Sequence, residues 1–205
     1  MSYNPRPHDL LWGMTPDQLP ADAPAWAHQA LAAGHPVVVR RVLCGPGMVA
    51  VGLRGASREQ RLAAVMPVRS IQRLLSPEQL SQRAPGQWPA LRALAAVKPV
   101  LDAVGLPWGP TGGVGFQLAT GIPVLHEASD LDLVLRTANP FCRQQARELL
   151  AVLSDAPCRI DLQLETPNGA VALREWAGDS QRVLLKCADG ARLVDNPWLA
   201  LERAA

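Results

Sequence analysis

Aromatic residues and net charge are both scarce in this chain of 205 residues. Only 4% of the residues are aromatic, and six of the nine are tryptophans, so a platform that stacks nucleic-acid bases is not expected. Lysines and arginines number 20 against 18 aspartates and glutamates, a formal net charge of +2. This balance argues against coating a nucleic acid by charge alone. The composition therefore predicts no nucleic-acid partner.

Long apolar runs and paired cysteines are also missing. No uncharged apolar stretch approaches the roughly 20 residues that a membrane-spanning helix needs, and residues 1–8 lack the pattern of a secretion signal. The four cysteines form neither a CxxC pair nor a zinc-binding spacing, so they are expected to be core residues in a reducing compartment. They are Cys44, Cys142, Cys158 and Cys187. We expect a cytoplasmic protein with no membrane partner.

The length allows one domain or two small ones. The stretch Arg-Ala-Pro-Gly-Gln at 83–87 is the best candidate for a linker. We therefore predict an α+β protein with a small N-terminal α/β domain at residues 1–84, which binds a substrate or partner. Residues 85–205 would form a second, catalytic domain.

Local patterns predict most of the elements. In the N-terminal part we expect a helix at 26–33, strands at 35–42 and 47–53, and a helix that begins at Ser57, with Gln60 as its capping partner. The later elements are expected at 76–78 and 88–104 (helices), 107–115 (a glycine-rich loop), 116–120 (a helix), near Asp130 (a strand), 140–154 (a helix), 159–164 (a strand), and 173–176 with 183–186 (a hairpin).

Three aspartates carry the strongest chemical signal. Asp130 and Asp132 are separated by one residue at an apolar run, which places both carboxylates on one face of a strand. Asp161 lies in a second alternating strand, so three carboxylates converge if the two strands are neighbours. Clustered carboxylates repel unless cations neutralise them, and Mg²⁺ prefers such oxygen ligands. The pattern indicates metal-dependent phosphoryl or nucleotidyl transfer.

Each motif by itself has a plainer explanation. A lone Asp-x-Asp, or Asp161 alone, is more often a set of solvated surface acids than a metal site. The ordered set, a Gly112-Gly113 loop followed by the three aspartates, favours the metal site. A dinucleotide-binding GxGxxG motif fails because Leu118 stands where the third glycine belongs, and no Gly-Lys-Ser/Thr of a P-loop is present. A haloacid-dehalogenase-like phosphatase fits poorly, because there the acids end an apolar strand rather than begin one.

The order of the motifs resembles the nucleotidyltransferase superfamily, over roughly the C-terminal half of the chain. Its pattern of a glycine loop, an hDhD strand and a later hDh strand (h, apolar) matches 112–113, 130–133 and 160–162. The resemblance implies a nucleotidyltransferase-type domain with a mixed sheet flanked by helices. It also implies Asp130, Asp132 and Asp161 as ligands of Mg²⁺ or Mn²⁺, with Asp161 helping to deprotonate the attacking hydroxyl.

A closer resemblance spans essentially the whole chain. The stretches that carry it are His-Asp-Leu-Leu-Trp at 8–12, Trp-Gly-Pro-Thr-Gly-Gly-Val-Gly-Phe at 108–116, Ser-Asp-Leu-Asp-Leu at 129–133 and Asp-Asn-Pro-Trp at 195–198. They resemble the phosphoribosyl-dephospho-CoA transferases of malonate decarboxylase, also called its holo-[acyl-carrier-protein] synthases.

The closer resemblance implies a specific reaction. The donor would be 2'-(5''-triphosphoribosyl)-3'-dephospho-CoA, and the acceptor a serine of the decarboxylase's apo acyl-carrier subunit, with diphosphate released. One position departs from the superfamily pattern, because Gly113 stands where the superfamily usually has serine. Thr111 or a backbone amide would replace that hydroxyl in binding the phosphates.

Basic residues outside these motifs are weaker candidates. Arg54 and Arg58 flank a predicted helix start and could hold the donor's phosphates or an acidic face of the carrier; a solvated helix end explains them equally well. Lys186 could pair with the triphosphate, although a surface lysine is the plainer explanation.

Two other functions stay open at this point. One is the same fold acting with ATP on another protein or a small molecule. The other is a non-catalytic assembly protein that binds the carrier, which only Gly113 supports. Preference for ATP over the triphosphoribosyl donor, or absence of Mg²⁺-dependent diphosphate release, separates them.

Overall fold

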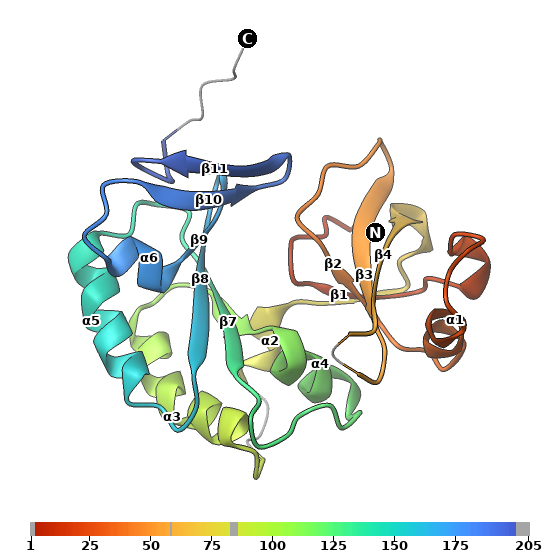
Figure 1. Ribbon diagram of the computed structural model, residues 1–205, viewed down its shortest axis with the longest axis horizontal. Helices are drawn as coiled ribbons and strands as arrows, with labels where there is room; N and C mark the ends of the chain where they lie inside the picture. The colour runs from red at the N-terminus through yellow and green to blue at the C-terminus, as the bar shows by residue number, and fades with distance from the viewer. Residues whose placement is uncertain (1–2, 58, 83–85, 200–205) are drawn as a thin grey trace. The chain divides into compact units, whose positions relative to one another are not determined.

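The computed structural model describes residues 3–57, 59–82 and 86–199. The chain divides into two compact units (Figure 1). The first unit is Met1–Ser76 with Ala119–Ile122, and the second is Pro77–Leu118 with Pro123–Ala205. Each unit has its own sheet with helices, which confirms an α+β fold with two domains. The boundary predicted after residue 84 falls in the segment 83–85, outside the described residues.

The first unit is built on an antiparallel sheet with the strand order β4-β3-β2-β1-β5. One face of this sheet and helix α1 enclose an apolar core that includes Leu11, Val51 and Leu31. Its elements are β1 (Leu10–Trp12), η1 (Pro16–Gln18), α1 (Ala25–Ala32), β2 (Val37–Val39), β3 (Met48–Arg54), β4 (Arg61–Pro67), η2 (Val68–Ser70) and β5 (Arg73–Leu75).

The helix predicted from Ser57 is wrong, because the structure has strand β4 there. The Gln60 side chain does bind the backbone of preceding residues, as a capping residue would. It accepts hydrogen bonds from the N–H groups of Ala56 and Ser57, at 2.8 and 3.3 Å. These bonds close the turn of a β-hairpin instead of a helix end. The ladder with β3, which pairs β4 along its whole length, overrides the local helix signal.

The second unit is built on a mixed sheet with the strand order β11-β10-β9-β8-β7-β6. Strands β7 and β8 are parallel and the other neighbours are antiparallel. Its elements are α2 (Pro77–Leu80), α3 (Pro89–Ala103), β6 (Trp108–Pro110), α4 (Gly112–Thr120), β7 (Leu131–Arg136), α5 (Arg143–Ser154), β8 (Ile160–Thr166), β9 (Gly169–Ala172), α6 (Leu173–Ala177), β10 (Val183–Cys187) and β11 (Gly190–Val194).

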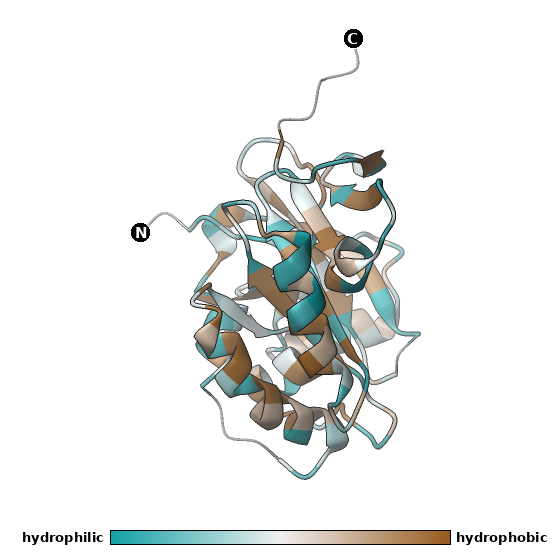
Figure 2. Ribbon diagram, turned by 90° about the vertical axis from the view of Figure 1, so that its left-hand side faces the viewer, coloured by the Kyte–Doolittle hydropathy of each residue, from teal (hydrophilic) through white to brown (hydrophobic). Residues whose placement is uncertain are grey.

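The two faces of this sheet differ in chemistry. On one face, alternate leucines of β7 and β8, such as Leu133 and Leu162, pack against α3, α5 and α6 in a single core. These helices show brown and teal residues in Figure 2, as amphipathic helices do. The other face, here called the polar face, carries the intervening residues. They are Asp132, Val134 and Arg136 of β7 and Asp161, Gln163 and Glu165 of β8.

Two further predictions about elements need correction. Residues 173–176 were expected to be one arm of a hairpin, but Leu173 begins helix α6, and β10 pairs with β9 and β11 instead. The predicted loop at 107–115 contains the short strand β6, and α4 already begins at Gly112. The glycines of this stretch have a low helix propensity, which is why a loop was expected. Burial of Val114 and Phe116 stabilises the helix in spite of them.

Candidate metal and phosphate site

The structure brings the three predicted aspartates together on the second unit. One carboxylate oxygen from each of Asp130, Asp132 and Asp161 lies within 4.8 Å of the others. The register explains the convergence, because Asp132 and Asp161 are direct partners in the parallel β7–β8 pair. Asp130 lies just before β7, on the loop that leads into it. The site therefore stands at the amino ends of two neighbouring parallel strands.

The three carboxylates fit a hard divalent cation. All three side chains are partly exposed, so water and ions can reach them. An all-oxygen donor set of this kind suits Mg²⁺ or Mn²⁺. Without a cation, three negative charges at this separation repel one another.

Gly112, the first residue of α4, lies directly against this cluster. Its φ of +56° is in the left-handed region, and a Cβ there would collide with the carboxylate of Asp132. The N–H of Thr111 donates to the carbonyl of Asp132 at 2.9 Å, which fixes the start of α4 beside β7. Glycine at 112 is therefore required for α4 to begin beside the carboxylates, where the positive end of its dipole favours anions.

Arg159 is a residue of the site that the sequence reasoning missed. Its Nε and one terminal nitrogen donate to Oδ1 of Asp161 at 3.2 and 3.0 Å. A sequence signal was available, since Arg159 stands two residues before Asp161 and so faces the same side of the chain as that aspartate. The guanidinium supplies one positive charge to a cluster of three negative ones.

Cys158 contributes no charge to the site. Burial raises the pKa of its thiol, and the negative charge of Asp130 raises that pKa further, while a backbone hydrogen bond with Leu131 lowers it. The net effect keeps the thiol protonated at neutral pH.

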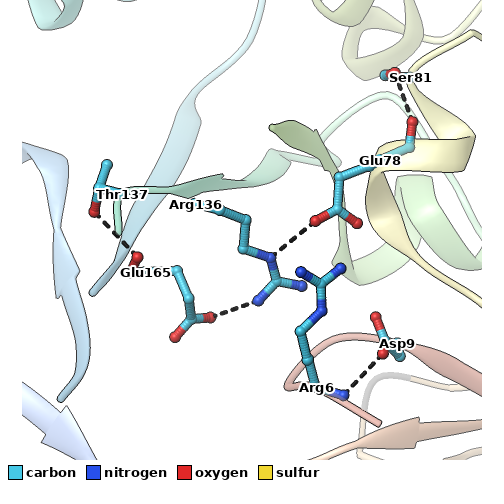
Figure 3. A network of polar contacts seen from close by, with 7 residues as sticks. All are labelled: Arg6, Asp9, Glu78, Ser81, Arg136, Thr137 and Glu165. Carbon is cyan, nitrogen blue, oxygen red and sulfur yellow. Dashed lines mark hydrogen bonds and ion pairs between the residues drawn. The ribbon is translucent and has the colours of Figure 1, made fainter. Parts of the chain in front are cut away.

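A second group of charged residues lies farther along the polar face (Figure 3). Arg136 is 9% exposed and lies between two carboxylates, with Nε 3.0 Å from Glu78 and a terminal nitrogen 3.1 Å from Glu165. Arg136 and Glu165 are partners in the β7–β8 register. Glu78 comes from α2, so this network joins α2 to the two strands that carry the aspartates.

The other predicted site residues are not all gathered here. Gly113 is in the first turn of α4, next to Gly112. Lys186 of β10 shares the polar face, but it is level with Glu165. That position is four residues along β8 from Asp161 and two strands away, or roughly 16 Å at ordinary strand spacings. Arg54 is the last residue of β3 in the first unit, and Arg58 lies outside the described residues.

In the part of the chain that the structure describes, no helix is both long and apolar enough to cross a membrane.

Comparison with known families covers almost the whole chain. Residues 74–197 match the model described as phosphoribosyl-dephospho-CoA transferase MdcG C-terminal domain, and residues 6–77 match the corresponding N-terminal domain. A phosphoribosyl-dephospho-CoA transferase from Pseudomonas putida (strain W619) is 66% identical over 201 residues, covering 98% of each chain. Proteins of the same name from Azotobacter vinelandii and Pseudomonas aeruginosa are 58% and 54% identical, over 94–97% of the chains. No solved structure matches this chain.

These matches define an enzyme of the transferase class. The chain belongs to the phosphoribosyl-dephospho-CoA transferase family, and the relatives share that activity in name over their full length.

Proposed function

We propose that this enzyme moves the phosphoribosyl-dephospho-CoA group from 2'-(5''-triphosphoribosyl)-3'-dephospho-CoA to a serine of the apo acyl-carrier subunit of malonate decarboxylase, in the cytoplasm. The serine oxygen attacks the phosphorus of the triphosphate that is bonded to the 5'' oxygen of its ribose. A new phosphodiester bond forms, the bond to the next phosphate breaks, and diphosphate leaves. The convergence of Asp130, Asp132 and Asp161 in a chain of this family is the observation that supports the proposal.

Each residue of the cluster has a part in this reaction. Asp130 and Asp132 would hold one or two divalent cations, Mg²⁺ or Mn²⁺, and Asp161 would share them. When bound, the metal neutralises the triphosphate and stabilises the attacking and leaving oxygens. Asp161 would also help to deprotonate the serine hydroxyl, the role that the resemblance to nucleotidyltransferases implies for it.

The start of α4 would bind the phosphates. Gly112 and Gly113 let the backbone approach the phosphate oxygens closely, and the free N–H groups of a helix's first turn donate to anions. Thr111, next to them, is the candidate for the hydroxyl that serine supplies in the wider superfamily. Arg54 and Arg58 stay candidates for holding the donor's phosphates or an acidic face of the carrier, and Lys186 stays a candidate for pairing with the triphosphate.

Diphosphate release by purified enzyme, carrier, donor and Mg²⁺ tests the metal assignment. Asp132→Asn should lower the rate more than about 100-fold, since even losing a residue that orients a ligand costs 10- to 100-fold. Asp189→Asn is the matched control, because Asp189 lies on the exposed turn before β11, far from the cluster. A normal rate in Asp132→Asn would overturn the metal assignment. Substituting ATP for the donor tests the alternative nucleotidyltransferase, which would then release diphosphate as fast or faster.

A further inference from the structure

Arg159 is an exposed side chain that forms an ion pair with one carboxylate of the cluster, Asp161. Its side chain is 70% exposed, yet two of its nitrogens converge on a single oxygen of Asp161, whose side chain is 37% exposed. The arginine therefore lies at the solvent side of the site rather than inside the unit. The ion pair with Asp161 holds the guanidinium in place, and water would solvate it if that pair broke.

This contact competes with a metal for the same carboxylate. A guanidinium stays positive at every physiological pH, so a divalent cation that reaches Asp161 meets a like charge 3.0 Å from its ligand oxygen. The conflict is relieved only if the arginine swings away. An exposed ion pair of this kind contributes little stability, so displacing the guanidinium from Asp161 costs little free energy.

A displaced Arg159 would have an anionic partner close by. A triphosphate that shares the metal with the three aspartates must lie within a few ångströms of Asp161. Guanidinium groups bind phosphate oxygens through two parallel hydrogen bonds. The charge that neutralised Asp161 would then neutralise the departing diphosphate.

We propose that Arg159 exchanges partners during the reaction: it is the counter-ion of Asp161 in the metal-free enzyme, and it binds the leaving diphosphate part of the donor once metal occupies Asp161. The proposal rests on the metal site of the proposed function. It assigns Arg159 to the substrate-binding residues, and before metal binds, the guanidinium would limit the repulsion between the three carboxylates.

Two measurements on Arg159→Ala test the exchange, because the variant should bind Mn²⁺ more tightly but bind the donor more weakly. Calorimetric titration of the metal-free enzyme with Mn²⁺, in the absence of donor, should show about two- to fivefold tighter binding in Arg159→Ala, because a competing charge is gone. The same variant should need at least about tenfold more donor, measured as KM, because hydrogen bonds to a charged group are lost. Arg159→Lys keeps the charge but not the fork, and should give an intermediate KM.

Arg192→Ala is the matched control. It removes the same charge from an exposed ion pair on β11, three strands from β8, and should change neither quantity. Unchanged or weaker Mn²⁺ binding in Arg159→Ala, or an unchanged KM, would overturn the exchange while wild type still binds Mn²⁺ and transfers the group. Failure of the wild type itself to bind Mn²⁺ would instead overturn the metal site, and the exchange with it.

Discussion

At the scale of single residues, the contact between Gly112 and Asp132 constrains the geometry of the site. The left-handed backbone of Gly112 and the collision of any Cβ with the Asp132 carboxylate act together. A side chain at 112 would strain the first turn of α4 and push Asp132 away from the other two carboxylates.

Gly112→Ala should therefore lower Mn²⁺ affinity and transfer rate by at least about tenfold, with the fold retained. Gly105→Ala is the control that isolates backbone strain, because Gly105 also has a left-handed φ, +72°, but open space around its Cβ position. Both variants should lose about 1 kcal/mol of stability, measured by urea unfolding. Equal Mn²⁺ affinities in the two variants would contradict the steric argument.

The sequence was sufficient to predict that the three aspartates converge, but not the contact that Gly112 makes with one of them. Asp130, Asp132 and Asp161 follow from alternation in apolar strands, a period-2 signal that survives without tertiary information. The contact of Gly112 with Asp132 depends on how β6 and β7 pair, which no local pattern specifies. The pairing of Arg159 with Asp161 could have been found, because the two residues alternate to the same side of the strand expected at 159–164.

At the scale of elements, the parallel β7–β8 pair sets the spacing of the site, and Arg136 links its far end to α2. Arg136 is almost fully buried between two carboxylates. Breaking a buried ion pair from one side is costly, because a charge is left in poorly solvated surroundings.

Arg136→Ala should destabilise the enzyme by about 3–5 kcal/mol, measured as a lower urea midpoint with the far-ultraviolet circular dichroism unchanged at low urea. Arg182→Ala is a suitable control, since that side chain binds one backbone carbonyl at an exposed position. A loss below about 1 kcal/mol in Arg136→Ala would show that the network contributes little.

Asp102, near the end of α3, leads to a prediction about how the stability of the protein depends on pH. The Asp102 carboxylate accepts hydrogen bonds from Lys98 at 2.6 Å and from the indole of Trp108 at 3.0 Å, and these lower its pKa below the ordinary 3.8. A lowered folded-state pKa stabilises the protein above the unfolded pKa, and this stabilisation is lost as the pH falls through the folded one. Asp102→Asn should therefore be less stable than wild type at pH 7, with a difference that shrinks below pH 4. A difference independent of pH would contradict this.

Elements with a strong period were predictable and those decided by their neighbours were not. Helix α3 and strands β3 and β8 lie close to their expected positions because each has an apolar pattern of its own. Strand β4 and helix α6 were assigned the wrong type. Their local signals were weak, and pairing with β3 in one case, and packing of Leu173 and Trp176 into the core in the other, decided the outcome.

At the scale of the whole molecule, charge is divided unevenly between the two units. Residues 1–76 contain eight arginines and four acidic residues, whereas the rest of the chain has 12 basic and 14 acidic residues. The carboxylate cluster lies on the second unit, and Arg54 lies on the first. An anionic donor or an acidic partner is thus attracted mainly by the first unit.

Arg54→Ala should raise the KM for donor or for carrier about tenfold, the usual effect of removing a charged hydrogen bond. Mn²⁺ affinity should stay at the wild-type value, because Arg54 is not among the three carboxylates assigned to the metal. If neither KM changes, Arg54 has no part in binding.

Intact mass spectrometry of the apo carrier subunit tests the central claim most directly. The carrier would be incubated with this enzyme, Mg²⁺ and the triphosphoribosyl donor, beside an Asp130→Asn sample. The account predicts a single mass increase that equals one phosphoribosyl-dephospho-CoA group, and none with Asp130→Asn. An unmodified carrier in the presence of authentic donor, or equal modification by Asp130→Asn, would contradict it.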